Sequence, residues 1–164
     1  MKRFSAFLMI FSALTFSACS DDDDGDNGNG NGGDLSVGTF EATVSGDINE
    51  DINGIAYYET VDGEVAITLF VSFTEWPFIT FLFNPPVEEG IYTAIRTATG
   101  QEDDETNASA SNGNFLFFGN GGSVTITNVA SEQIDGEFTV NFEYSDGTEE
   151  VNIVIDGSFS AEKD

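Results

Sequence analysis

The chain has 164 residues, of which 30 are acidic and 4 are basic, and its formal net charge at pH 7 is -26. This balance argues against a nucleic-acid partner, because such binding depends on cationic neutralisation of phosphates. The chain also contains no histidine, which removes Ser-His-Asp and Cys-His catalysis and the commonest zinc ligand.

The first residues have the pattern of a cleaved secretory signal. Lys2 and Arg3 supply its positive charge, Phe4–Phe16 is largely apolar, and small residues precede Cys19, the single cysteine of the chain. This apolar run is shorter than the about 20 residues that a spanning helix needs. We therefore predict a signal peptide over residues 1–18.

The five residues Thr15-Phe16-Ser17-Ala18-Cys19 resemble a bacterial lipobox, with Phe16 in the place of the usual leucine. The resemblance implies that a diacylglycerol alkylates the Cys19 thiol, that the signal is then removed, and that the new amino terminus is acylated. Two or more acyl chains give stable anchoring. The alternative is cleavage by the ordinary signal peptidase, which would leave Cys19 as an incidental thiol.

An acidic run follows the cysteine at once: Ser20, Asp21, Asp22, Asp23 and Asp24. It resembles the export signal of Bacteroidota-type surface lipoproteins, and this resemblance implies the outer face of the outer membrane. The alternative is a solvated charge run that keeps a tether extended. Residues 19–34 are rich in Asp, Asn and Gly, so we predict a disordered tether there.

Once Lys2 and Arg3 leave with the signal, only Arg96 and Lys163 oppose the 30 acidic residues. Such a charge fits a soluble, self-repelling surface protein, a cation-binding protein or a saline habitat. It argues against a domain that lies flat on an anionic membrane, so the lipid anchor is the expected membrane contact.

Residues 35–164 suit a single domain, and period-2 alternation dominates them. Phe40, Ala42 and Val44 are expected to face one side of a strand, and Val65 begins a longer row of the same kind. Asp62-Gly63 between strand-like runs is a strong hairpin signal, because the favoured tight turns need positive φ.

Two segments, Phe78–Phe83 and Phe115–Phe118, are apolar on both faces. Such strands are often buried on both sides, and core packing is the expected role here. They could instead line a barrel cavity for an apolar ligand. Gly119-Asn120-Gly121-Gly122 reads as a turn between strands.

The C-terminal third predicts a meander of antiparallel strands. Asp135-Gly136 precedes an alternating run that begins at Phe138, and Asp146-Gly147 predicts a hairpin turn. No apolar pattern of helical period persists after the signal. We therefore predict an all-β fold of about nine strands, either an antiparallel β-sandwich or an up-and-down β-barrel.

The strands Gly122–Thr127, Ile134–Thr139 and Val151–Phe159 are similar to the C-terminal repeats of small Bacteroidota lipoprotein domains of unknown function. That family carries no known catalytic residues, so the resemblance implies none in this chain.

Calcium is the sharpest cofactor hypothesis. Asp47, Asn49, Asp51 and Asn53 place oxygen-bearing side chains at alternate positions, as calcium loops do. The string from Asn49 matches the opening of an EF-hand loop, but Glu59 falls one place early for the bidentate ligand. The alternative is a turn rich in Asx residues, which is the more frequent meaning of such a string.

Trp76, Tyr57 and Tyr58 are candidates for stacking on a sugar ring. The many carboxylates leave open a small hydrolase, which would need two of them about 5–10 Å apart in a cleft. Our leading hypothesis is a cell-surface lipoprotein whose β domain is a non-catalytic binding or structural module with an unidentified glycan or surface-protein partner. The first rival is a carbohydrate- or calcium-binding accessory module, and the second is the hydrolase.

Overall fold

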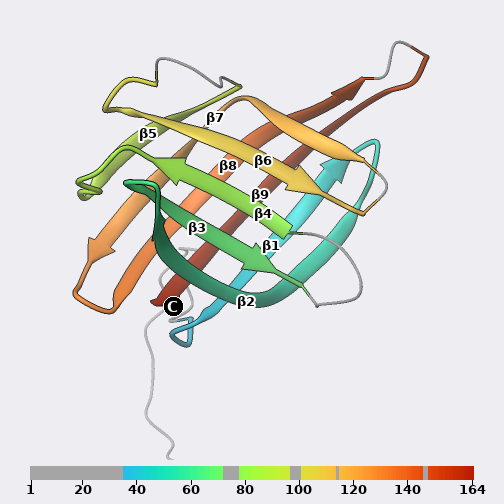
Figure 1. Ribbon diagram of the computed structural model, residues 1–164. Helices are drawn as coiled ribbons and strands as arrows, with labels where there is room; N and C mark the ends of the chain where they lie inside the picture. The colour runs from blue at the N-terminus through green and yellow to red at the C-terminus, as the bar shows by residue number, and fades with distance from the viewer. Residues whose placement is uncertain (1–34, 72–77, 97–100, 114, 146–147) are drawn as a thin grey trace, which may run out of the picture. The chain divides into compact units, whose positions relative to one another are not determined.

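Nine β-strands and no helix make up the regular structure in the computed structural model, which describes residues 35–71, 78–96, 101–113, 115–145 and 148–164 (Figure 1). All of these residues belong to one compact unit. The strands are β1 (Thr39–Gly46), β2 (Glu50–Val61), β3 (Glu64–Phe70), β4 (Phe78–Phe83), β5 (Gly90–Ile95), β6 (Glu105–Ser111), β7 (Leu116–Val129), β8 (Gln133–Ser145) and β9 (Glu150–Lys163). The predicted all-β fold is confirmed.

The strands form one sheet that closes on itself as a barrel, in the order β1-β2-β3-β4-β6-β5-β7-β8-β9. Closure comes from β1, which pairs antiparallel with β2 on one side and with β9 on the other. Because the sheet is closed, each strand that the structure describes has a neighbouring strand on both sides.

The order departs from a simple up-and-down barrel at β5 and β6. The long strand β7 pairs with β6 near Phe118 and with β5 near Val124, so β5 fits where β6 and β7 diverge. This places β5 parallel to β6 over a short stretch. A second short parallel pairing joins β2 to β9. These two parallel pairings differ from the predicted fold, in which all neighbouring strands are antiparallel.

Large side chains fill the centre of the barrel. The Phe81 ring lies 5.2 Å from that of Phe138 and 6.4 Å from that of Phe159, measured between centroids. Phe83 meets Tyr92 edge-on at 5.0 Å. Each of these side chains is at most 7% exposed, so these rings belong to the packed core of the barrel.

The turn predicted at Asp62-Gly63 is confirmed, and a second Asp-Gly pair has a different setting. Asp62 and Gly63 have φ of 53° and 93° and join β2 to β3. Asp135-Gly136 instead lies inside β8, where a Cβ on Gly136 would come within 2.6 Å of the Phe159 ring. This glycine makes room for packing and does not form a turn. Asp146-Gly147 lies outside the described residues.

Gly119-Asn120-Gly121-Gly122 is also not a turn between strands. The segment lies within β7, and the register against β8 shifts between Gly119 and Gly122, as in a β-bulge. Gly121 and Gly122 both have positive φ, at 114° and 95°. The bulge therefore interrupts β7 without ending it.

Candidate binding surfaces

The outer side of β2, β3, β4, β6 and the start of β7 carries a continuous set of uncharged side chains. Their continuity follows from the register, which sets Ile55 beside Phe70, Phe70 beside Phe78, and Ser111 beside both Phe78 and Leu116. We call this set the uncharged face. It consists of Ile55, Tyr57, Thr68, Phe70, Phe78, Thr80, Ser109, Ser111, Leu116 and Phe118.

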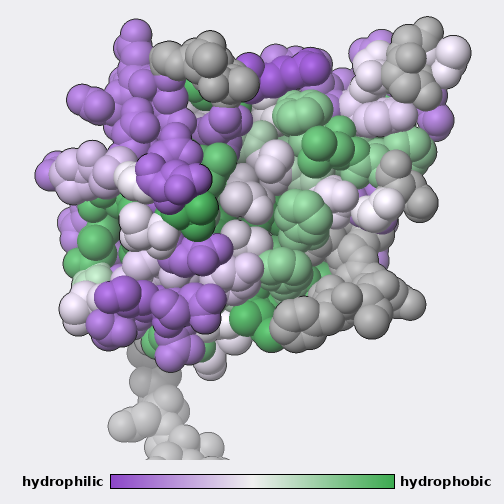
Figure 2. Space-filling model, in the orientation of Figure 1, coloured by the Kyte–Doolittle hydropathy of each residue, from purple (hydrophilic) through white to green (hydrophobic). Residues whose placement is uncertain are grey.

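Hydrophobic residues on this face reach solvent. Ile55 is 50% exposed, Leu116 47% and Phe78 39%. Figure 2 shows hydrophobic residues in a band over β3, β4 and β6, while hydrophilic residues gather on the left of the view, with smaller hydrophobic areas between them. The two segments predicted to be buried on both sides are therefore buried on one side only, because the barrel presents the outer side of β4 and β7 to solvent. Contiguous apolar patches of this kind mark interaction sites on soluble domains.

The aromatic rings of the uncharged face support one another. Tyr57 and Phe70 stack with their centroids 5.7 Å apart and their planes 13° apart. Phe70 also lies 6.0 Å from Phe78. Because neighbouring rings restrict one another, these side chains form a pre-ordered contact surface, which lowers the entropy cost of binding.

At one end, the uncharged face meets an ion pair. Arg96 Nη1 donates to Glu143 Oε1 at 2.8 Å, and the guanidinium carbon lies 4.9 Å from the centroid of the Phe118 ring. Glu143 Oε2 accepts from Asn120 Nδ2 at 2.7 Å. The carboxylate that borders the face is thus compensated by a cation.

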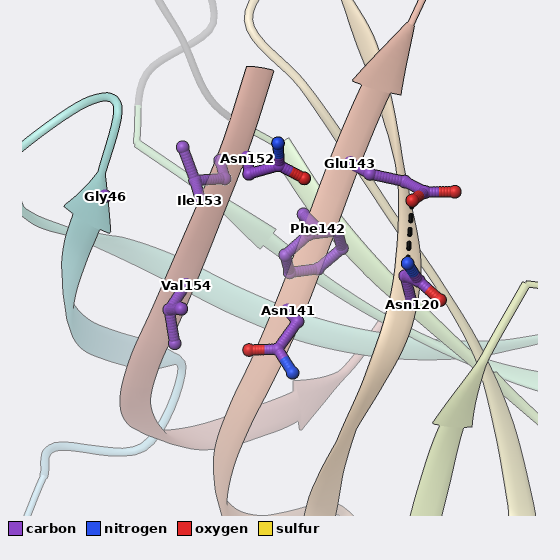
Figure 3. Close-up of a pocket in the computed structure, with 8 residues that line it drawn as sticks. All are labelled: Gly46, Asn120, Asn141, Phe142, Glu143, Asn152, Ile153 and Val154. Carbon is purple, nitrogen blue, oxygen red and sulfur yellow. Dashed lines mark hydrogen bonds between the residues drawn. The ribbon is translucent and has the colours of Figure 1, made fainter. Parts of the chain in front are cut away.

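Beyond Glu143, a shallow open hollow of about 330 Å³ lies over β7, β8 and β9 (Figure 3). We call it the asparagine hollow. It is lined by Gly46, Asn120, Asn141, Phe142, Glu143, Asn152, Ile153 and Val154. Figure 3 shows the amide side chains rising from neighbouring strands, with Asn120 bonded to Glu143.

The four residues of the calcium hypothesis occupy different settings. Asp47 Oδ2 accepts from the Asn152 backbone N–H at 2.8 Å, on the β9 side of β1. Asp51 Oδ1 accepts from Thr43 Oγ1 at 2.9 Å, on the β2 side. Asn49 Nδ2 donates to the Gly46 carbonyl oxygen at 3.0 Å, and Asn53 lies two residues after Asp51 in β2.

At this end of the sheet β1 lies between β2 and β9, and neighbouring strands lie about 4.8 Å apart, so the two aspartates are bonded on opposite sides of β1. Within the described ranges, no group of three or more Asp, Glu, Cys or His side chains is placed to hold a metal ion. Calcium binding stays a prediction.

Of the three candidates for stacking on a sugar ring, Tyr57 and Tyr58 point to opposite sides of β2. Tyr57 lies on the uncharged face, stacked on Phe70. Tyr58 points into the barrel, is 9% exposed, and donates its hydroxyl to the Ser131 carbonyl oxygen at 3.1 Å. The Tyr58 ring is therefore not presented to a ligand. Trp76 lies outside the described residues, as do Cys19 and the acidic run from Ser20 to Asp24.

Among the residues that the structure describes, the carboxyl group of Asp135 has a pKa below its ordinary value. Burial raises the pKa of Asp135, but hydrogen bonds from Gln133, Asn128 and Ser160 lower it, and the net shift is downward. Gln133 Nε2 donates to Oδ1 at 2.7 Å and Asn128 Nδ2 donates to Oδ2 at 2.8 Å. A general acid needs a raised pKa, so the lowered pKa of Asp135 does not suit that role.

Sequence reasoning did not identify either surface. The exposed positions of β4 and β7 are apolar in the sequence, but apolar residues on both faces of a strand indicate burial and not an exposed surface. The asparagines of the hollow come from segments more than twenty residues apart in places, so no local pattern links Asn120, Asn141 and Asn152. The glycine run 119–122 was the one available sign of an irregular surface at this point.

The part of the chain that the structure describes contains no helix with the length and hydrophobicity to cross a bilayer. Comparison with known proteins gave no match to a protein-family model, to a curated protein or to a solved structure.

Proposed function

We propose that this chain is a lipid-anchored protein of the outer bacterial membrane, displayed on the cell exterior, whose β-barrel is a non-catalytic module that docks a partner protein. The observation that carries the docking function is the uncharged face. It is aromatic and free of charge in a chain with 30 acidic residues, and it is exposed at Ile55, Phe78 and Leu116.

The anchor part of the proposal is supported by the lipobox-like sequence ending at Cys19 and by the acidic residues Ser20–Asp24. An acylated Cys19 holds the protein at the membrane, and the Gly-rich tether of residues 19–34 gives the domain a reach of roughly 20 Å. A domain held in this way meets partners in the space outside the cell.

A protein partner explains the composition of the face. Cores of protein interfaces are depleted in charge and enriched in aromatic residues and arginine. Phe70, Phe78 and Phe118 match that composition, and Arg96 lies at the margin. The exposed aliphatic side chains of Ile55 and Leu116 suit an apolar protein surface better than a sugar ring, which is recognised through rings and paired polar groups.

The charges around the uncharged face indicate which residues the partner should carry. Glu59 follows Tyr57 on the outer side of β2, and Glu143 lies opposite Phe118, so carboxylates border the uncharged face. We expect a partner surface with an apolar centre and basic residues around it. Such a contact associates faster at low salt, because complementary charge steers the encounter.

The test uses the full-length lipoprotein, purified in detergent, as bait for proteins of the cell surface. The wild type is compared with Phe78→Arg, which places a charge in the centre of the face, and with Ile91→Arg. Ile91 is a matched control, because it is 70% exposed on β5 and outside the face. We expect a partner protein whose affinity falls at least tenfold with Phe78→Arg, is unchanged with Ile91→Arg, and weakens as salt rises.

Equal affinity of both variants would remove the uncharged face from the proposal. Binding of neutral glycans that Phe78→Arg abolishes would assign the face to carbohydrate instead. The anchor is tested separately, by mass spectrometry of the native N-terminus and by protease treatment of intact cells. An unmodified Cys19 thiol, or a domain that survives the protease, would contradict the surface location.

A further inference from the structure

The asparagine hollow exists because glycines leave a gap in the outer layer of side chains. A Cβ on Gly46 would lie 2.7 Å from the Asn152 carbonyl oxygen, so no larger residue fits at the end of β1. On the other side of the hollow, Gly121 and Gly122 form the bulge of β7, and neither projects a side chain over β8. The hollow is therefore formed by the backbone at these glycines and does not depend on the rotamers of the surrounding side chains.

The groups that line the hollow keep hydrogen-bonding capacity for a ligand. The exposed Asn141 side chain makes no hydrogen bond to any residue that the structure describes. Asn120 uses Nδ2 on Glu143, which leaves Oδ1 as an acceptor. The Asn152 side chain makes a long bond of 3.3 Å from Nδ2 to Glu150 Oε1 and also keeps Oδ1. Each primary amide offers both donors and acceptors.

The register places these groups around an apolar side chain. Val154 lies opposite Asn141 on the neighbouring strand, and Asn152 lies opposite Glu143. The amides span β7, β8 and β9, a width of about 10 Å at normal strand spacing. This width matches a single sugar ring, whose carbon-bound hydrogens would rest on Val154 while its hydroxyls reach the amides.

Charge excludes two other ligand classes. An anion would meet the carboxylates of Asp47, Glu143 and Glu150, and Arg96, the cation near the hollow, is already paired with Glu143. A cation could use only the oxygen atoms of the amides, and their N–H donors would be left without a partner. Neutral groups that both donate and accept hydrogen bonds, such as vicinal hydroxyls, fit the remaining amides best.

We infer that the asparagine hollow binds one neutral sugar residue of a glycan. Asn141 is the main recognition residue, Asn120 and Asn152 provide further contacts, and Val154 forms the apolar floor. This site is separate from the uncharged face, so it does not depend on the docking function proposed above.

The experiment probes the full-length lipoprotein in detergent with an array of neutral oligosaccharides built from glucose, galactose, mannose and N-acetylglucosamine. The best binder is then titrated against wild type, Asn141→Ala, Asn152→Ala and Asn53→Ala. Asn53 is a matched control, because it is an exposed asparagine on the outer side of β2, away from the hollow. Phe78→Arg is included to report on the uncharged face.

We expect at least tenfold weaker binding for Asn141→Ala, a smaller loss for Asn152→Ala, and no change for Asn53→Ala or Phe78→Arg. Melting curves of the variants should match that of the wild type, since the substituted side chains are exposed. The inference would be overturned if no neutral glycan bound at millimolar concentration, or if both asparagine variants retained full binding. Loss of binding in Phe78→Arg alone would move the sugar to the uncharged face and likewise overturn it.

Discussion

Arg96 and Glu143 form an ion pair of 2.8 Å at the border between the uncharged face and the asparagine hollow. The same guanidinium lies over the Phe118 ring, and the same carboxylate accepts from Asn120. One pair of residues thus neutralises charge where the two surfaces meet. Arg96 therefore makes both an ion pair and a cation–π contact, although its side chain is exposed.

Replacement of Arg96 by alanine should lower the free energy of unfolding by about 1 kcal/mol at most, because the pair is partly exposed and screened by solvent. The loss should shrink in high salt. Urea denaturation at low and high salt measures both effects. Lys163→Ala is the matched control, since Lys163 lies 3.8 Å from Glu132 in a more exposed pair and should contribute less. Equal losses in the two variants would refute the added effect of Phe118.

Replacing phenylalanine by alanine should cost much more stability on the inner side of β4 than on its outer side. Phe81 is fully buried against Phe138 and Phe159, so Phe81→Ala should cost about 3–5 kcal/mol through lost burial and a residual cavity. Phe78→Ala, on the outer side, should cost about 1 kcal/mol or less. Chemical denaturation of both variants checks this contrast. A large loss for Phe78→Ala would mean that the uncharged face is part of the stabilising core.

Gly122 is a position where the backbone requires glycine. Its φ is 95°, and an added Cβ would overlap the Thr139 carbonyl oxygen. Gly122→Ala should therefore destabilise the domain by about 2 kcal/mol or more, from strain and displacement of β8. Gly90→Ala is the control, because its Cβ would meet nothing within 4 Å and its φ is not positive. Thermal melts that shift equally for both would refute the close packing at the bulge.

Asp135 predicts an acid-dependent part of stability. Its pKa is lower in the folded protein than in the unfolded chain, where it is about 3.9, so the folded state binds fewer protons. The contribution is therefore complete above about pH 4 and is lost as the pH falls through the lower folded value. The difference in unfolding free energy between wild type and Asp135→Asn should be largest above pH 4 and should shrink in stronger acid.

Urea denaturation across that pH range measures this difference. Glu137→Gln serves as the control, because Glu137 is an exposed carboxylate two residues further along the same side of β8. A difference for Asp135→Asn that stays constant with pH would show that the hydrogen bonds from Gln133 and Asn128 do not favour the ionised form.

Local patterns made much of the fold predictable. Phe40, Ala42 and Val44 alternate in the sequence, and all three point into the barrel because successive side chains of a strand face opposite sides. The Asp62-Gly63 hairpin was predictable for a similar reason, since its positive φ values depend on those two residues alone. The absence of helical periodicity predicted the all-β class.

Closure and pairing were not predictable in this way. Whether the sheet closes depends on β1 pairing with β9 across more than a hundred residues, and the placement of β5 between β6 and β7 depends on where β7 bends. The same limit applies to Asp135-Gly136, which has the composition of a turn but lies within β8 because Phe159 needs the space beside Gly136.

The sequence by itself determined the signal-like start, the acidic character, the strand periodicity and the side of each strand on which its apolar residues lie, because these are properties of neighbours along the chain. Only the tertiary structure decided that the outer side of Phe78 is left uncovered and that Asn120, Asn141 and Asn152 meet at one hollow. The physical reason is that register between distant strands is set by the packing of the whole barrel. The sequence of one strand does not determine which neighbouring strand its outer side chains will contact.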